Sequence, residues 1–183
     1  LPPFIVTYAV QSILRGMVYV ITGAGTIRLT SKVFLEFGGG SVGPIPFPVI
    51  YMVVIIALSI LLLSRSKLGR HMYAIGGNPK AARFAGINTK RIKILIYTLS
   101  GVCAALAGLV LTSRNSSMQP AVGNGAEMDA IAAVVLGGTT MAGGRGAIAG
   151  TILGAFIIGF INNGLNMLKM DSFYQYICKG DVI

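Results

Sequence analysis

The side chains that could do chemistry in this sequence are few and scattered. Among five carboxylates, Glu127 and Asp129 lie two residues apart, so on a helix they point to different faces and cannot form a close acid/base pair. His71 is the single histidine and has no carboxylate or cysteine at ligand spacing. Cys103 and Cys178 show no metal or redox spacing, so we expect two free thiols. We therefore expect no catalytic site, no metal site and no cofactor.

The glycine-rich stretch 137–146 suggests phosphate binding as a further kind of chemistry. A phosphate loop of the Gly-x-x-x-x-Gly-Lys-Ser/Thr type needs a lysine that this stretch lacks, and no soluble strand precedes it. Glycines for tight helix packing and for a bent membrane segment explain the stretch better. If the protein uses ATP, another chain must bind it.

Positive charge is concentrated in residues 65–93. This stretch carries eight of the fifteen basic residues and none of the five acidic ones, and it lies between two apolar runs. Nucleic-acid binding needs basic charge spread over a solvated face, so we expect no nucleic-acid partner. A short basic loop between apolar runs marks the cytoplasmic side of a membrane protein.

Residues 76–86 within this stretch predict a separate short helix. Asn78 can cap the first free N–H groups, Pro79 suits the first helical position, and Gly86 can close the end. A helix built into a cytoplasmic loop is a candidate docking element for another protein. The alternative is an ordinary solvated basic loop, since such loops are common in membrane proteins.

The elements that position these stretches are apolar helices. The chain of 183 residues is 54% apolar and only 11% charged, which argues against a soluble domain. A helix crosses a hydrocarbon core of ~30 Å at ~1.5 Å per residue, and four segments suit that length. They cover residues 3–22, 49–68, 94–112 and 147–168, and the segments 23–48 and 113–125 read as outer loops. The predicted fold class is all-α, a polytopic transmembrane helical bundle.

One further apolar segment, residues 128–136, is only two or three turns long. Residues 124–127 predict a capped helix start with Glu127 at the third position, and the helix ends at the glycines of 137–146. We therefore predict one broken or re-entrant membrane segment, which needs protein or a water-filled cavity around it. In transporters such interrupted helices often border the translocation path. Gly146, Gly150 and Gly154 recur every four residues and give the last span a smooth face.

Polar residues inside the predicted spans have two interpretations each. Arg15 either faces a helix bundle or watery cavity, or it snorkels towards one interface. Asn162, Asn163 and Asn166 near the end of the last span are explained about equally by bonding between helices, interfacial hydration or substrate contact.

In these residues the chain resembles the membrane-spanning permease of ribose-type sugar ABC importers, within the superfamily of branched-chain amino acid and ribose-type permeases. The matching motifs run along nearly the whole chain: Leu1-Pro2-Pro3-Phe4-Ile5-Val6-Thr7, Arg15-Gly16, Leu68-Gly69-Arg70, Tyr73-Ala74-Ile75-Gly76-Gly77-Asn78, Ala81-Ala82-Arg83, Gly86-Ile87, Glu127-Met128-Asp129-Ala130-Ile131-Ala132-Ala133-Val134-Val135-Leu136-Gly137-Gly138-Thr139, Gly143-Gly144-Arg145-Gly146 and Asn163-Gly164-Leu165. The residues Tyr8-Ala9-Val10-Gln11 depart from the family pattern.

The resemblance implies a multi-pass subunit of the bacterial plasma (inner) membrane, with residues 1–183 forming a single permease domain in contact with membrane lipid. The implied partners are a second permease copy, two cytoplasmic ABC ATPase subunits and a periplasmic sugar-binding protein. The ATPases would hydrolyse ATP, so the chain would be a transporter subunit and not an enzyme. Members of the family are longer, and we expect residues 171–183 to begin a further span, so we expect a fragment.

Two sets of site residues follow as hypotheses. Residues 76–88 would couple to the ATPase through a helix over residues 78–85, with contacts or shape set by Gly77, Asn78, Lys80, Ala82, Arg83, Phe84 and Gly86. The segment 127–145 would line the sugar path, and the candidate path residues are Arg15, Glu127, Asp129, Thr139, Asn162 and Asn163. The alternatives are an ABC permease for another small solute, an intramembrane enzyme and an ion channel. An enzyme would place paired polar groups at membrane depth, and a channel would conduct without ATP.

Overall fold

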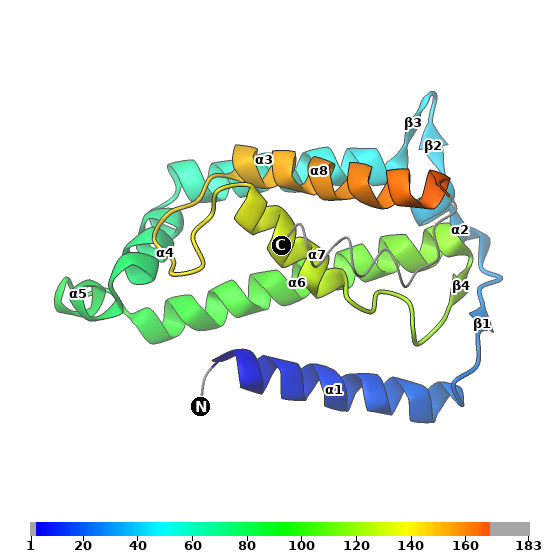
Figure 1. Ribbon diagram of the computed structural model, residues 1–183, viewed down its shortest axis with the longest axis horizontal. Helices are drawn as coiled ribbons and strands as arrows, with labels where there is room; N and C mark the ends of the chain where they lie inside the picture. The colour runs from blue at the N-terminus through cyan, green and yellow to red at the C-terminus, as the bar shows by residue number, and fades with distance from the viewer. Residues whose placement is uncertain (1–2, 169–183) are drawn as a thin grey trace. The chain divides into compact units, whose positions relative to one another are not determined.

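The computed structural model describes residues 3–168, nearly all of them in helices or in short connections between helices. In chain order the elements are α1 (Pro3–Thr22), β1 (Ile27–Arg28), α2 (Lys32–Gly39), β2 (Ser41–Val42), β3 (Ile45–Pro46), α3 (Phe47–Arg65), α4 (Lys67–Gly77), α5 (Pro79–Phe84), α6 (Thr89–Asn115), β4 (Ser117–Met118), α7 (Ala126–Leu136) and α8 (Ile148–Met167) (Figure 1). Cys178 and the further span predicted over residues 171–183 lie outside the described residues.

Four helices of the described part are long and apolar enough to cross a membrane, namely α1, α3, α6 and α8. Helix α3 is the most apolar of the four, with a mean hydropathy of 2.7 over an 18-residue window. No residue in the membrane-length windows of α1, α3 or α6 is buried, so these helices leave much of their apolar surface exposed. Lipid accepts such an apolar surface. A helix is also stable there because it satisfies its own backbone N–H and C=O groups, which lipid cannot do. The predicted all-α, multi-pass fold is confirmed.

The chain forms two units, and the first comprises residues 3–53 and 99–124. Its connection from α1 to α3 was predicted as a loop, but it contains helix α2 and the two-residue strands β2 and β3, which pair antiparallel. Ser113 of α6, only 1% exposed, accepts a hydrogen bond from the Gly38 N–H at 2.7 Å. Gly38 is required there, since a Cβ would lie 2.7 Å from the carbonyl oxygen of Val110. A contact with a distant helix thus stabilises α2, which explains why local signals missed it.

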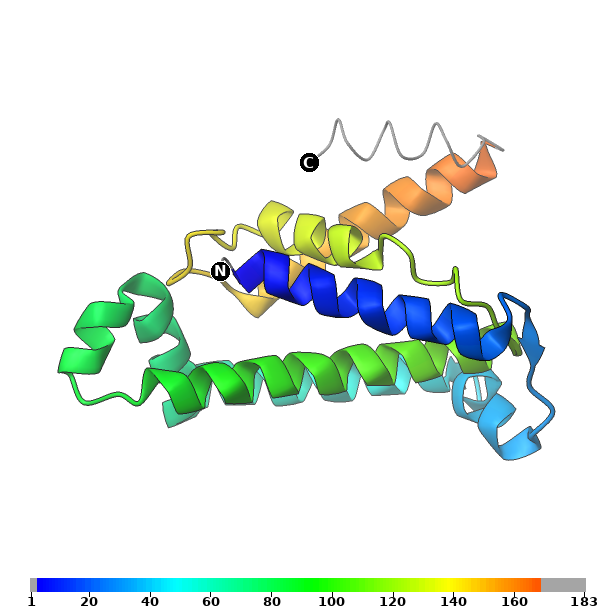
Figure 2. The same cartoon turned by 90° about the horizontal axis from the view of Figure 1, so that it is seen from below.

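The second unit comprises residues 54–98 and 125–168 of the described chain. Here the basic stretch 65–93 is mostly helical, because α4 and α5 occupy it before α6 begins at Thr89. Ser66 caps α4 by accepting a hydrogen bond from the Gly69 N–H at 3.1 Å. Helix α4 ends where α5 begins, and Figure 2 shows the two helices forming a bend ahead of α6.

Helices α7 and α8 form an antiparallel hairpin and lie side by side (Figure 1). The 11 residues of α7 extend about 16 Å, roughly half of a hydrocarbon core. Gly150 and Gly154 of α8 contact the backbone of α7 so closely that a Cβ on either would lie 1.9 Å from a carbonyl oxygen, of Gly137 and Ala133 respectively. The broken segment predicted from the glycines is confirmed.

Candidate functional site

Helix α5 is a six-residue helix that is closed at both ends. The Asn78 side chain accepts hydrogen bonds from the N–H groups of Lys80 at 3.0 Å and Ala81 at 3.1 Å, and Pro79 occupies the first position. At the other end Gly86 adopts φ +79°, and the Ile87 N–H donates to the Ala82 carbonyl at 3.0 Å. This is a Schellman ending, in which the left-handed glycine lets the chain satisfy the last free carbonyls. The short helix predicted from Asn78, Pro79 and Gly86 is present.

One side of α5 is fixed to its neighbours. Ala82 is 4% exposed and packs with Ile75 of α4 and Ile92 of α6. The Arg83 Nε donates a hydrogen bond to the hydroxyl of Thr89, which is 5% exposed, at 3.0 Å. Ala82 therefore packs inward, and α4, α5 and the start of α6 share one small core.

The opposite side of α5 is open to solvent. Phe84 is 92% exposed, the largest exposed fraction among the large apolar side chains of the described residues. Lys80 and Arg83 are also exposed, so the ring lies among positive charges and outside the membrane-length helices. An exposed aromatic ring is unfavourable in water and is a frequent anchor in protein interfaces. The geometry suits docking of another protein against this side.

A polar pair lies within the α7–α8 hairpin. The amide Nδ2 of Asn162 donates to the Asp129 Oδ2 at 3.4 Å, a long hydrogen bond. The Oδ1 atom of the same amide is buried and has no hydrogen-bond partner among residues 3–168. A buried carbonyl oxygen left without a donor costs about 1–3 kcal/mol. Asn162 thus retains a free acceptor at a place where the two helices meet.

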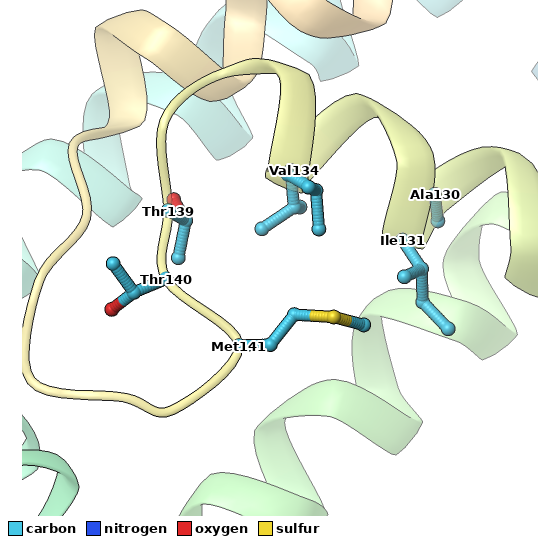
Figure 3. A pocket seen from close by; sticks show the side chains of 7 residues that line it. Ala130, Ile131, Val134, Thr139, Thr140 and Met141 are labelled. Carbon is cyan, nitrogen blue, oxygen red and sulfur yellow. The ribbon is translucent and has the colours of Figure 1, made fainter. Parts of the chain in front are cut away.

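The turn between α7 and α8 borders two hollows. The first, about 260 Å³, is lined by Ala130, Ile131, Val134, Val135, Thr139, Thr140 and Met141. Figure 3 shows the side chains of Thr139, Met141 and Ile131 arranged around it, with the Thr139 methyl group towards the hollow. The second, about 330 Å³, lies between this turn and the last turns of α4. Thr139 lines both hollows, and their walls are mostly apolar.

The candidate path residues of the second unit do not gather at one place. The structure brings together Asp129 and Asn162, whereas Thr139 lies beyond the opposite end of α7. Asn163 is exposed on α8. In the other unit, the guanidinium of Arg15 donates to the side-chain oxygen of Asn124. Asn124 lies in the connection that precedes α7, and the two environments expected for Arg15, a cavity or an interface, stay predictions.

The helix start predicted over residues 124–127 has a different structure. Gly125, with φ +81°, precedes the first residue of α7, and no side chain caps the helix. Glu127 lies in the first turn but not at the third position expected for a capping box. Its carboxylate still lies where the helix dipole favours negative charge.

Tyr73 and Thr140 were not among the predicted site residues. The Tyr73 hydroxyl donates to the Gly146 carbonyl at 2.8 Å, and the Thr140 hydroxyl donates to the Gly143 carbonyl at 3.0 Å. Both bonds fix the turn that carries Thr139. The only available signal was the presence of Tyr73 in a family motif.

The comparisons with known proteins agree with this architecture. The family model described as "Branched-chain amino acid transport system / permease component" matches residues 1–181. The ribose import permease of Bacillus subtilis (strain 168) is 50% identical over 183 residues, which is 99% of this chain and 57% of that protein. The ribose import permease of Escherichia coli (strain K12) is 46% identical over 98% of this chain and 57% of its own length.

A third relative, the D-allose transport system permease of Escherichia coli (strain K12), is 41% identical over 100% of this chain and 56% of its own length. The chain therefore spans little more than half the length of these curated relatives. No solved structure matches it. With four membrane-length helices among residues 3–168, it is a multi-pass protein of the bacterial inner membrane, and it belongs to the family of branched-chain amino acid transport system permease components.

Proposed function

We propose that the chain supplies part of the membrane path of an ATP-driven sugar importer and docks a cytoplasmic ATPase through α5. The support for a sugar is that the relatives described above are named as ribose and D-allose permeases. A further relative in Haemophilus influenzae, 45% identical over 76% of this chain, is named as a xylose permease. The alternative solute is an amino acid, because the family description names branched-chain amino acids.

The observation that carries the ATPase role is the division of α5 into a fixed side and an open side. Ala82 and the Arg83–Thr89 hydrogen bond fix the helix, while Phe84 and Lys80 are left exposed. A groove of an ATPase subunit would receive the Phe84 ring, and acidic groups around the groove would attract the basic side chains. The short, closed helix loses little entropy on docking because it is already formed.

The basic residues of the stretch 65–93, which contains α5, indicate on which side of the membrane this stretch lies. Residues 65–93 hold eight of the fifteen basic residues and no acidic ones, so this stretch is the cytoplasmic face of the chain. The connections 23–48 and 113–125 then face the periplasm. A periplasmic sugar-binding protein would deliver the solute there, and a second permease copy would complete the path.

The α7–α8 hairpin would border the path. Among the described residues, only this hairpin would place irregular backbone at membrane depth, in the turn between its two helices. Such backbone is stable where protein or water covers it. The free Oδ1 of Asn162 and the Asp129 carboxylate are acceptors suited to sugar hydroxyl groups. Thr139 would border the path at the other end of the hairpin, where its methyl group faces the smaller hollow.

The test is transport by the complete permease, assembled with its ATPase and binding protein in lipid vesicles. We expect uptake of labelled D-ribose, D-allose or D-xylose that depends on ATP and on the binding protein. Uptake of labelled leucine in place of the sugars would assign the amino-acid alternative. Solute flux without ATP would instead indicate a channel and would overturn the proposal.

A further inference from the structure

We propose that the end of α4 and the turn between α7 and α8 form a glycine joint that carries the movement of α5 into the path hairpin. The glycine joint consists of Gly76 and Gly77 on α4 and of Gly143 and Gly144 in the turn. This inference rests on the proposed function, because it names the route by which the docking helix would act on the path. All of its parts belong to the second unit.

The two sides of the joint touch through backbone atoms. A Cβ on Gly76 would lie 2.6 Å from the Gly144 nitrogen, and a Cβ on Gly144 would lie 2.8 Å from the Gly77 Cα. Gly143 and Gly144 also adopt φ +88° and +80°, a region that other residues enter only with strain. Contact between two backbones has no flexible side chain in between, so a displacement of one side reaches the other directly.

The α5 side of the joint is stiff. Asn78 is the single residue between α4 and α5: its N–H donates to the Ala74 carbonyl at 3.1 Å, and its side chain caps α5. Ala82 and Ile75 pack in one cluster, which ties α5 to the last turns of α4. A displacement of α5 would therefore also move Gly76 and Gly77, because no flexible linker between α4 and α5 could absorb it.

The hairpin side is braced as well. The Tyr73 hydroxyl on α4 holds the Gly146 carbonyl at 2.8 Å, next to the joint. Inside the turn the Thr140 N–H donates to the Arg145 carbonyl at 3.1 Å, and the Gly143 N–H donates to the Thr140 carbonyl at 3.0 Å. A displacement at Gly143 or Gly144 would therefore move the whole turn between α7 and α8 as a rigid unit.

The movement of this piece would reach the path residue Thr139. Gly146 is so close to Thr139 that a Cβ would lie 2.8 Å from its side chain. The hollow of about 330 Å³ beside the joint is lined by both α4 and the turn. Unfilled space on that scale lets the turn shift without overpacking its neighbours. If the glycines served only for close packing, neither the Tyr73–Gly146 hydrogen bond nor the adjacent hollow would be needed.

The experiment compares two helical glycines in the complete importer in lipid vesicles. Gly76→Ala places a methyl group against the turn, whereas a Cβ on Gly101 of α6 meets nothing within 4 Å, so Gly101→Ala is the matched control. We expect Gly76→Ala to keep ATPase binding and ATP hydrolysis but to lower the ratio of D-ribose uptake to hydrolysis about tenfold. Gly101→Ala should change this ratio less than about twofold.

Tyr73→Phe provides a second variant that leaves the packing intact and removes one hydroxyl. We expect the uptake-to-hydrolysis ratio to fall about fivefold, the scale of one lost hydrogen bond. Movement of the turn is measured in both variants through an added Met141→Cys substitution, at a position that is 81% exposed. The rate at which a water-soluble thiol reagent labels this cysteine is compared with and without ATP. The ATP-dependent change in labelling should be present in the parent protein and absent in Gly76→Ala.

Equal uptake-to-hydrolysis ratios in Tyr73→Phe and the parent, with unchanged ATP-dependent labelling, would overturn the joint even if Gly76→Ala fails to assemble. Failure of the proposed function has a different signature, because the parent complex itself would then show no ATP-driven sugar uptake.

Discussion

The amide of Asn162 on α8 donates to the carboxylate of Asp129 on α7 at 3.4 Å, and its own carbonyl oxygen is buried without a donor among the described residues. A pair that served only to join two helices would be expected to satisfy both ends of the amide, because a membrane interior supplies no water to replace a missing partner. The unused acceptor instead suits a solute that brings its own hydroxyl donors.

The first prediction concerns this acceptor. Asn162→Ala should lower sugar uptake about five- to tenfold, since one hydrogen bond from a neutral amide to a bound solute contributes about 1 kcal/mol, up to ~1.5 kcal/mol. The measurement is uptake at equal amounts of purified protein. Phe160→Leu is the control, because Phe160 on the same helix is 74% exposed. Equal uptake by Asn162→Ala and the parent would remove Asn162 from the path.

Phe84 provides the second prediction. Phe84→Ala should weaken binding of the ATPase subunit about 30-fold, since truncation of a central aromatic anchor costs ~2 kcal/mol. The stability of the permease itself should not change, because the ring is 92% exposed and supports no core. Co-purification and a binding titration in detergent measure the effect, and Arg83→Glu should act in the same direction.

The matched control for Phe84 is Val33→Ala in α2, where the side chain is 81% exposed but lies outside the basic stretch. Retention of full ATPase affinity by Phe84→Ala would mean that α5 is an ordinary solvated helix.

The glycines of α8 lead to a third prediction, about stability. Gly154→Ala should destabilise the protein by about 1–3 kcal/mol, because its methyl group would overlap the Ala133 carbonyl and force the hairpin apart. Gly159→Ala on the same helix should leave the protein as stable or up to about 1 kcal/mol more stable, since nothing lies within 4 Å of a Cβ there and alanine favours a helix more than glycine does. Thermal unfolding in detergent compares the two, and identical midpoints would contradict the close α7–α8 contact.

A fourth prediction isolates the cap of α5. Asn78→Ala should cost about 1 kcal/mol of local helix stability by freeing the N–H groups of Lys80 and Ala81. Hydrogen exchange of these two amides should accelerate about fivefold, while the Arg91 amide, which is capped by Asn88, should exchange as before. Unchanged exchange at residues 80 and 81 would show that neighbouring packing, and not the cap, holds α5.

Local chemistry made much of this fold predictable. The long apolar runs gave the four spans, and the order Asn78, Pro79 and Gly86 gave α5 because each residue satisfies a specific need of a helix end. The glycines after Leu136 likewise marked the break in the membrane segment. In each case the information lies within a few residues of the feature that it determines.

Contacts between distant residues could not be predicted in the same way. Helix α2 depends on Ser113, Arg15 is bonded to Asn124, and Tyr73 holds Gly146, yet no periodicity or spacing in the chain relates these partners. Asn162 and Asp129 appeared separately among the candidate path residues, and only the hairpin geometry makes them a pair.

The hydrogen bond between Gly38 and Ser113 also has a consequence for the order in which the chain is assembled. The two residues are 75 positions apart, and both α3 and the greater part of α6 lie between them. At a synthesis rate of roughly 5–20 residues per second, the segment around α2 waits about 4–15 s for its partner. During that interval α2 has neither the Ser113 hydroxyl nor the surface of α6, so its anchoring is among the last steps in the biogenesis of this unit.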